Sequence, residues 1–280
     1  MKITLLGTGS PLPSATCAGP STLVQAGGQN ILVDAGRAVV MRLLPAGSPP
    51  PFLSAVLLTH LHSDHICDLN DVITTRWVAS PAATPFDIYG PVGTKKMVDG
   101  LLAMLALDEG YRLDHHDDLR AAGGMKVVVH EVQPGDSFSV GDVVVSVHRT
   151  DHRPVAPTIG FRFEHDGVVA ALAGDTIPCA ELDVMCTSAD FYVQTVIRED
   201  LVRQFATLVP TGERFLDILD YHSTVEQAAQ TAARNGVKTL VLTHFVPAIQ
   251  PGQEDEWRAM AAAHFAGEIV VGPDLTSVEK

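Results

Sequence analysis

Short apolar runs separated by glycine- and proline-rich turns fill the first third of the chain. Such runs are typical of buried strands, because a helix needs a longer segment with apolar residues every three or four positions. The runs predict strands at Ile3–Leu6, Thr22–Gln25, Ile31–Val33 and Ala55–Thr59, and a further strand is expected at Asp87–Tyr89. Ala26–Asn30 contains two adjacent glycines and predicts a hairpin turn between the second strand and the third.

The rest of the chain continues with strands and then alternates strands with helices. Four segments rich in β-branched residues predict further strands, at Val127–Val132, Val143–His148, Thr158–Glu164 and Val168–Ala173. The last third predicts strand, helix, strand, helix and strand in turn, at Phe191–Ile197, Thr224–Asn235, Thr239–Thr243, Asp255–Phe265 and Glu268–Val271. Earlier helices are expected at Arg37–Leu44, Asp64–Ser80 and Thr94–Leu107. This order predicts an α/β fold of two sheets stacked between outer helices. Residues 1–280 are interpreted as a single domain, because no linker or repeat interrupts them.

Composition indicates the compartment in which the protein is found more than its activity. A chain of 280 residues that is 46% hydrophobic is long enough to bury a sizeable core. No stretch approaches the roughly 20 apolar residues that cross a bilayer, and the apolar start is too short for a signal peptide. The four cysteines form no Cys-x-x-Cys pair, which favours a reducing compartment. We therefore expect a cytoplasmic protein with no membrane partner.

The formal net charge of −14 bears on the kind of partner. The chain has 19 lysine and arginine residues against 33 aspartate and glutamate residues. A general polyanion binder is expected to be basic. The balance therefore argues against a nucleic-acid partner and favours a small-molecule substrate, although it leaves a local basic patch open.

One short segment concentrates side chains that bind metal ions. His60, His62, Asp64 and His65 follow the apolar run Ala55–Leu58, so they lie where a buried strand ends. Neutral imidazole and carboxylate groups suit zinc and similar divalent ions. The first two histidines are expected to hold one ion, while the aspartate and the third histidine hold a second. The alternative is a solvent-facing polar loop that binds no metal.

Two ions need more ligands than one loop provides, and three later residues also lie at strand ends. His152 follows one predicted strand, Asp175 closes another directly after a glycine, and His244 ends a third. Strand ends at one edge of a sheet converge in space. The expected site has three side chains on each ion and one bridging carboxylate: His60, His62 and His152 on the first, Asp64, His65 and His244 on the second, and Asp175 between them. A hydroxide between the ions is the expected nucleophile, because bound metal lowers the pKa of water from about 16 toward 7.

These assignments have alternatives. His148 competes with His152, but it lies inside a predicted strand, where packing is the expected role. Asp175 could cap a turn, since Gly-Asp pairs are common in turns. A second cluster, His115–Asp118, looks like a metal site but lies in a polar stretch before two glycines. We interpret that cluster as a solvated loop.

Several motifs resemble those of the metallo-β-lactamase-fold hydrolases, and within them the ribonuclease Z and arylsulfatase-like branch. The segments that carry the resemblance run along the whole chain: Leu6–Pro11, Val33–Gly36, His60–His65, Tyr89–Thr94, Ala173–Thr176, His222–Thr224 and Leu242–Phe245. The resemblance implies a four-layer αββα sandwich of two mixed sheets with two zinc ions. The oxygen and nitrogen ligands leave manganese or iron open in place of zinc. The resemblance also implies a role for His222 in stabilising a phosphoryl transition state. Because dimers are frequent in that branch, a homodimer is expected.

The chain departs from the ribonuclease pattern at two places. The ribonucleases carry His-Glu-Ala-Thr where this chain has Gln194–Ile197, so the glutamate that would orient His222 is missing. The alternative for His222 is then a neighbour of a helix N-cap with no chemical role. The ribonucleases also insert a long tRNA-gripping arm where this chain has only enough residues for two strands and a turn, between His152 and Asp175. Together with the acidity, these departures argue against tRNA as the substrate.

The sequence thus predicts a dinuclear zinc hydrolase of small phosphodiester or aryl sulfate esters, that is, a phosphodiesterase or arylsulfatase. In this interpretation Asp64 helps to orient the nucleophile, and His222 donates a hydrogen bond or proton to the leaving group. One alternative keeps the ions but hydrolyses a lactone, a lactam or another carbonyl compound. Two further alternatives rank lower: a tRNA 3′ processing endonuclease, and a relative that binds metal without catalysis.

Overall fold

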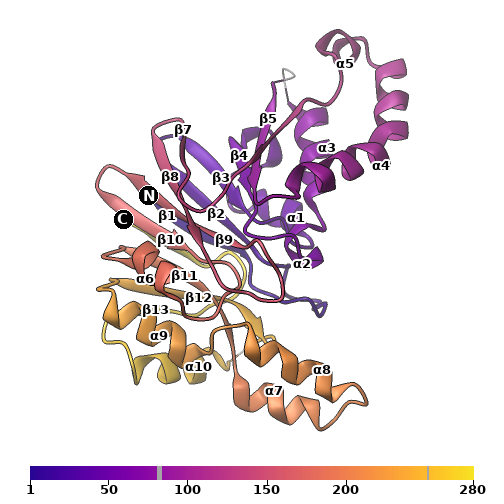
Figure 1. The fold of residues 1–280 in the computed structure, drawn as a ribbon. Helices are drawn as coiled ribbons and strands as arrows, with labels where there is room; N and C mark the ends of the chain where they lie inside the picture. The colour runs from indigo at the N-terminus through magenta and orange to yellow at the C-terminus, as the bar shows by residue number, and fades with distance from the viewer. Residues whose placement is uncertain (81–83, 251) are drawn as a thin grey trace.

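Two β-sheets packed face to face form the centre of the molecule, and helices cover the outer face of each (Figure 1). The computed structural model describes residues 1–80, 84–250 and 252–280. Within these residues each sheet has seven strands, and each contains both parallel and antiparallel pairs. The predicted α/β architecture, a four-layer αββα sandwich of two mixed sheets, is therefore confirmed.

The first sheet takes its strands from the first half of the chain and one from the C-terminal end. These strands are β1 (Lys2–Gly7), β2 (Ser21–Ala26), β3 (Gln29–Val33), β4 (Ala55–Leu57), β5 (Phe86–Gly90), β6 (Val127–Glu131) and β14 (Ser277–Glu279). In space they run in the order β14-β1-β2-β3-β4-β5-β6. The pairs from β14 to β3 are antiparallel, and the pairs from β3 to β6 are parallel.

The second sheet takes its strands from the second half of the chain. They are β7 (Ser137–Val140), β8 (Val143–Arg149), β9 (Ile159–His165), β10 (Val168–Leu172), β11 (Phe191–Ile197), β12 (Thr239–Val246) and β13 (Glu268–Val270). In space they run in the order β13-β12-β11-β10-β9-β8-β7. The pairs from β10 to β13 are parallel, so these strands end at the same edge of the sheet.

Helices cover both sheets, and two helix pairs project beyond them (Figure 1). The first half of the chain forms α1 (Val39–Leu43), α2 (Ser63–Ile66), α3 (Leu69–Ala79), α4 (Thr94–His115) and α5 (Asp117–Ala122). The second half forms α6 (Ala180–Cys186), α7 (Glu199–Ala206), α8 (Gly212–Asp217), α9 (Val225–Arg234) and α10 (Glu254–Ala262). Short 3₁₀ helices occupy Pro50–Phe52 and Ile218–Asp220. One projecting pair is α4 and α5, and the other is the α7–α8 hairpin on the opposite side.

The core lies between the two sheets. Ile3 and Ile31 of the first sheet belong to the same buried cluster as Val145 and Phe161 of the second. Every second residue of β8 from Val143 to Val147 is buried, which is the pattern of a strand with one face on the core and the other toward solvent. There are two further buried clusters, one between each sheet and the helices that cover it.

The helices differ from the prediction near the metal-binding motif and at the end of α4. The helix expected at Asp64–Ser80 is split into α2 and α3, because Ala35 hydrogen-bonds at the break. The Ala35 N–H donates to the His65 carbonyl, and the Ala35 carbonyl accepts from the Asp68 N–H. The predicted solvated loop at His115–Asp118 is instead the junction of α4 and α5, with its side chains exposed. The prediction of a loop is therefore wrong, whereas the predicted exposure of these side chains to solvent is confirmed.

Some elements have no counterpart in the prediction. They are β7, β14, α5, α6, α7 and α8. Thr224 is the N-cap of α9: its side chain accepts a hydrogen bond from the Gln227 N–H, and the Gln227 side chain accepts one from the Thr224 N–H. No helix of the described chain is long and apolar enough to span a membrane.

Candidate metal centre

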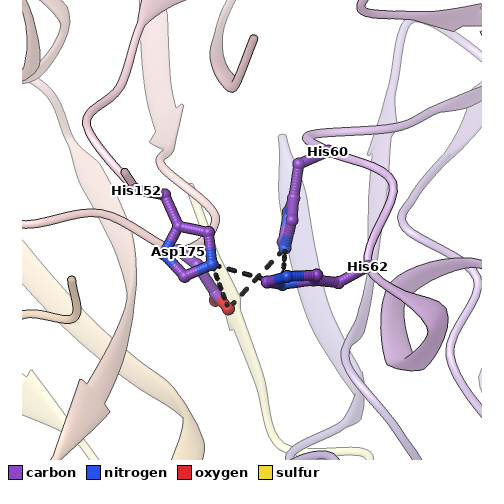
Figure 2. A group of neighbouring side chains, drawn as sticks. All are labelled: His60, His62, His152 and Asp175. Carbon is purple, nitrogen blue, oxygen red and sulfur yellow. Dashed lines mark hydrogen bonds and ion pairs between the residues drawn. The ribbon is translucent and has the colours of Figure 1, made fainter. Parts of the chain in front are cut away.

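Loops from both sheets bring three histidines and one carboxylate together (Figure 2). His60 and His62 lie between β4 and α2, His152 follows β8, and Asp175 follows β10. The His62 Nδ1 atom lies 3.1 Å from His60 Nε2 and 3.3 Å from His152 Nε2. Asp175 Oδ2 lies 3.8 Å from His60 Nε2 and 3.8 Å from His152 Nε2. The candidate ligand atoms of these four residues all lie within 4.8 Å of one another.

A second group lies on the other side of Asp175. It consists of Asp64 and His65 on α2 and His244 on β12. His244 Nε2 lies 3.3 Å from Asp64 Oδ2. Asp175 Oδ2 lies 3.4 Å from His65 Nε2 and 3.6 Å from His244 Nε2. The structure therefore brings together all seven residues predicted as ligands, with Asp175 between the two groups.

Gly174 lets the two halves of the site approach each other. Its φ is +66°, and a Cβ atom there would lie 2.8 Å from the side chain of Thr59. Only glycine has no Cβ and adopts this backbone conformation readily. The glycine before Asp175 therefore allows its loop to pack against the loop that carries His60.

Burial sets the protonation of the first group. Burial and the neighbouring His65 lower the pKa of His60 well below its usual range. Burial also lowers the pKa of His62, and it lowers the pKa of His152 to about 4. These three imidazoles are therefore neutral near pH 7, and their lone pairs can bind a cation.

Charge opposes burial in the second group. Burial acts against the charged form of His65, but the carboxylates of Asp175 and Asp34 outweigh it and raise the pKa of His65 well above its usual value. Asp175 and Asp64 in the same way raise the pKa of His244. Although burial disfavours its anion, the pKa of Asp175 is held well below its usual range by His244 and His65. A bound cation would displace the histidine protons, because a ligating imidazole is neutral.

Buried polar atoms without partners also fit a metal ion. Among the described residues, Asp175 Oδ1 and His65 Nε2 are buried and make no hydrogen bond. Such an atom typically costs about 1–3 kcal/mol. Imidazole nitrogens and carboxylate oxygens are the donors that zinc and related divalent ions take. The residues present therefore fit a divalent metal.

Comparison with known families places the fold and the site in one superfamily. The sequence model of the family described as "Beta-lactamase superfamily domain" matches residues 29–245, a segment that contains all seven candidate ligands. The chain belongs to the beta-lactamase superfamily.

Relatives in this superfamily extend over the full chain. Ribonuclease Z of Mycolicibacterium gilvum is 52% identical over 281 residues, covering 100% of this chain and 96% of the relative. Ribonuclease Z of Mycobacterium marinum is 53% identical over 281 residues, covering 100% of this chain and 98% of the relative.

Solved structures share the fold at lower identity. The metallo-beta-lactamase fold protein YhfI from Bacillus subtilis has a TM-score of 0.75 at 22% identity, and 100% of this chain and 98% of that chain are covered. Human tRNase Z, short form, has a TM-score of 0.72 at 24% identity, and 100% of this chain and 99% of that chain are covered. The predicted membership of the metallo-β-lactamase-fold hydrolases is confirmed, and the protein is a metal-dependent hydrolase.

Two predictions about function are wrong. Relatives named ribonuclease Z, more than half identical over the whole chain, contradict both the small-ester function and the expectation that nucleic acid is not a partner. The missing arm misled the prediction: an alignment of 281 residues that covers this entire chain leaves no room for a long insertion in those relatives either. Net charge misled it as well, because it averages over the molecule and binding depends on local charge.

Asp34 contacts the candidate site, although it was not predicted as a site residue. It follows β3, and its Oδ2 atom lies 2.8 Å from His65 Nδ1. The same carboxylate accepts hydrogen bonds from the Thr59 N–H and hydroxyl. The second nitrogen of a ligating histidine is commonly held in this way, which fixes the ring. The signal in the sequence was a carboxylate at a strand end, in the motif Val33–Gly36.

His152 and His148 have separate environments. His152 is buried, and its Nδ1–H donates to the Tyr221 carbonyl at 2.8 Å, which leaves Nε2 facing the other ligands. His148 lies on β8 and contacts Ser146 at 3.1 Å, outside both groups. The structure thus places His152 rather than His148 with the candidate ligands.

His222 lies beside Asp175 although its expected glutamate is missing. Its Nδ1–H donates to the Ile218 carbonyl at 2.9 Å, and its Nε2 lies 3.2 Å from Asp175 Oδ2. A backbone carbonyl therefore orients the ring. Gln194 is buried and has another role: it accepts from the Tyr192 hydroxyl and donates to backbone carbonyls, one of them that of Gly174.

A cavity of about 560 Å³ opens beside the two groups. His62, Asp64, Asp175, His222 and His244 line one end of it. The α7–α8 hairpin and the loop after β1 also line it. The candidate ligands are therefore accessible to a substrate from this side.

Proposed function

We propose that this protein is a metal-dependent ribonuclease that cleaves a phosphodiester bond at the 3′ end of a precursor tRNA. The single observation that carries the proposal is full-length similarity to proteins named ribonuclease Z, at 52–53% identity. The geometry supports it, because members of both candidate ligand groups and His222 line a cavity that opens to the outside.

The proposed cofactor is a pair of divalent ions, with zinc as the first choice. The proposed ligands are His60, His62 and His152 for one ion, Asp64, His65 and His244 for the other, and Asp175 for both. Such ions supply positive charge to the transition state and lower the pKa of the attacking water.

The side chains around the ions have roles of their own. We assign to Asp64, which lines the cavity, the orientation of the attacking water. His222 is held through Nδ1 by the Ile218 carbonyl, so Nε2 is the atom that faces the cavity. When the ring is protonated at both nitrogens, Nε2 would donate its proton to the leaving oxygen, and the ring would keep the proton on Nδ1. The orientation of the ring does not need the glutamate, because the backbone supplies it.

Cleavage of a precursor tRNA with a 3′ trailer tests the proposal. The zinc-loaded protein should release the trailer, and a chelator should abolish the release. Replacing His222 by alanine should lower kcat by about 10²–10⁴-fold, the usual range for a general acid, while the metal content measured by elemental analysis stays unchanged.

The matched control is His148→Ala, since His148 lies outside both ligand groups. This variant should cleave like the unmodified protein. Metal-loaded protein that leaves every precursor tRNA intact would refute the proposed function.

A further inference from the structure

The cavity beside the candidate metal centre has an apolar wall that the ligands do not explain. Val202 and Phe205 of α7, Phe215 of α8 and Ile218 line it, and His222 lies between this wall and Asp175. Figure 1 shows that the α7–α8 hairpin projects away from the sheets. The wall is therefore built by a segment that adds little to the central fold.

The two aromatic rings on this wall pack on each other rather than into the core. The ring centroids of Phe205 and Phe215 lie 4.9 Å apart at an interplanar angle of 86°. Both side chains are partly exposed, and neither belongs to the three buried clusters found among the described residues. Apolar surface left open beside a reactive centre is a mark of a ligand site.

One positive charge accompanies the rings. Arg214 of α8 lines the same cavity, and it makes no ion pair with any carboxylate of the described chain. The carboxylates that line the cavity, Asp64 and Asp175, both belong to the candidate ligand groups. In a chain of net charge −14, an unpaired guanidinium beside two aromatic rings is a local match to a phosphate and a base.

We propose that the α7–α8 wall binds one unpaired nucleotide that flanks the scissile phosphate. Its base stacks on Phe215, against which Phe205 packs edge-on, and Arg214 binds a phosphate of the same strand. This inference rests on the proposed ribonuclease function. A base inside a duplex offers no free face for stacking, so the wall selects a single-stranded end. The hairpin would thus hold the RNA at the site of cleavage.

Substitution of Phe215 separates stacking from packing. Phe215→Leu keeps an apolar side chain but removes the aromatic face, whereas Phe215→Tyr keeps that face. Loss of one stacked base typically weakens binding by about 5- to 150-fold. We expect Phe215→Leu to raise KM for precursor tRNA within this range with little change in kcat, and Phe215→Tyr to retain the original KM. Phe138→Leu is the matched control, because the Phe138 ring stacks on the Tyr89 ring, with centroids 4.0 Å apart, and Phe138 lies outside the cavity.

Binding without turnover gives an independent measurement. A short single-stranded RNA ending carries the fluorescent base 2-aminopurine at one of the two positions that flank the cleavage site, and the protein is treated with chelator. Stacking should quench the fluorescence with the original protein and with Phe215→Tyr, but not with Phe215→Leu. Arg214→Gln should weaken binding and lower its salt dependence by about one phosphate contact.

An abasic substitution in the precursor completes the test. Removing the base at one of the two flanking positions should raise KM about as much as Phe215→Leu does. The two changes together should raise KM no more than one of them alone. Fully additive effects, or a Phe215→Leu variant that binds and cleaves like the original, would overturn the stacking inference while leaving the ribonuclease function standing. Failure of the original protein to cleave any precursor tRNA would overturn both.

Discussion

At the scale of single residues, seven side chains predicted as ligands meet around Asp175. Their positions could be predicted because each lies at the end of an apolar run, and strand ends of this kind commonly converge on a site. Their role as ligands stays a prediction. Asp34 was not predicted, because its contact with His65 depends on how far β3 and α2 lie apart, which no sequence pattern gives. The carbonyl that orients His222 was missed for a related reason, since every residue has one.

Asp34 should control metal affinity through His65. Asparagine at position 34 removes the charge that holds His65 Nδ1 and still tolerates the positive φ of 59°. Loss of such a contact typically weakens metal binding by about 10- to 100-fold. We expect Asp34→Asn to do so in a zinc titration against a competing chelator.

The control for this measurement is Asp87→Asn. Asp87 pairs with His130 at the same 2.8 Å distance, but on the surface and away from the site. The Asp87→Asn variant should bind zinc with the same affinity as the original protein. Equal zinc affinities of Asp34→Asn and the original protein would contradict the orienting role of Asp34.

At the scale of elements, buried strands were predicted more reliably than short or projecting elements. Strands such as β4 and β12 were predicted because their apolar runs match a fully buried strand. The strand β14 has three residues and partly exposed side chains, so pairing with β1 defines it rather than its own sequence. The helices α7 and α8 have eight and six residues, and such short helices depend on packing against each other.

A carboxylate near the C-terminus fixes the loop that follows β1. Asp274 Oδ1 accepts hydrogen bonds from the Thr8 N–H at 3.0 Å and the Thr8 hydroxyl at 2.9 Å. Its Oδ2 accepts from the Ala18 N–H at 2.7 Å and from Arg42 Nε at 2.8 Å. Residues 10–14 of this loop line the cavity. The loop should therefore lose its position when the carboxylate is removed.

We expect Asp274→Ala to destabilise the protein by about 2–3 kcal/mol, since hydrogen bonds to a charged group are lost. It should also raise KM for precursor tRNA. Denaturant unfolding and steady-state cleavage measure the two effects. Asp117→Ala is the control, because its ion pair with Arg120 is exposed and such pairs contribute little. Unfolding curves of Asp274→Ala and Asp117→Ala that coincide would contradict this role.

At the scale of the whole molecule, the proposed ions would connect the two sheets. His60, His62, Asp64 and His65 follow β4 of the first sheet, whereas the other candidate ligands belong to strands or loops of the second: His152, Asp175 and His244. The sheets also share a buried core, whereas the single domain stays a prediction. Net charge, the other whole-molecule property used, did not predict the partner.

Removal of metal should therefore lower the thermal stability. Metal that is present at 1,000 times its Kd stabilises the folded state by about 4 kcal/mol. For a protein of this size, the loss corresponds to a fall in Tm of about 8–16 °C. Calorimetry with and without chelator should show the fall, and added zinc should reverse it. The response should be much reduced in His152→Ala and retained in His148→Ala. A Tm that does not respond to chelator would contradict metal cross-linking.

The pairing of β14 with β1 matters for a chain that is still being synthesised. The sheet that contains β1 to β6 can assemble early, but β1 keeps an open edge until residues 277–279 have been made. An unpaired edge strand can pair with another chain, which is a common start of aggregation. A protein cut short before Ser277 would keep every candidate ligand and still expose the part of β1 that pairs with β14, residues Lys2 to Thr4. Solubility of such fragments thus depends on a strand that lies far in sequence from the chemistry.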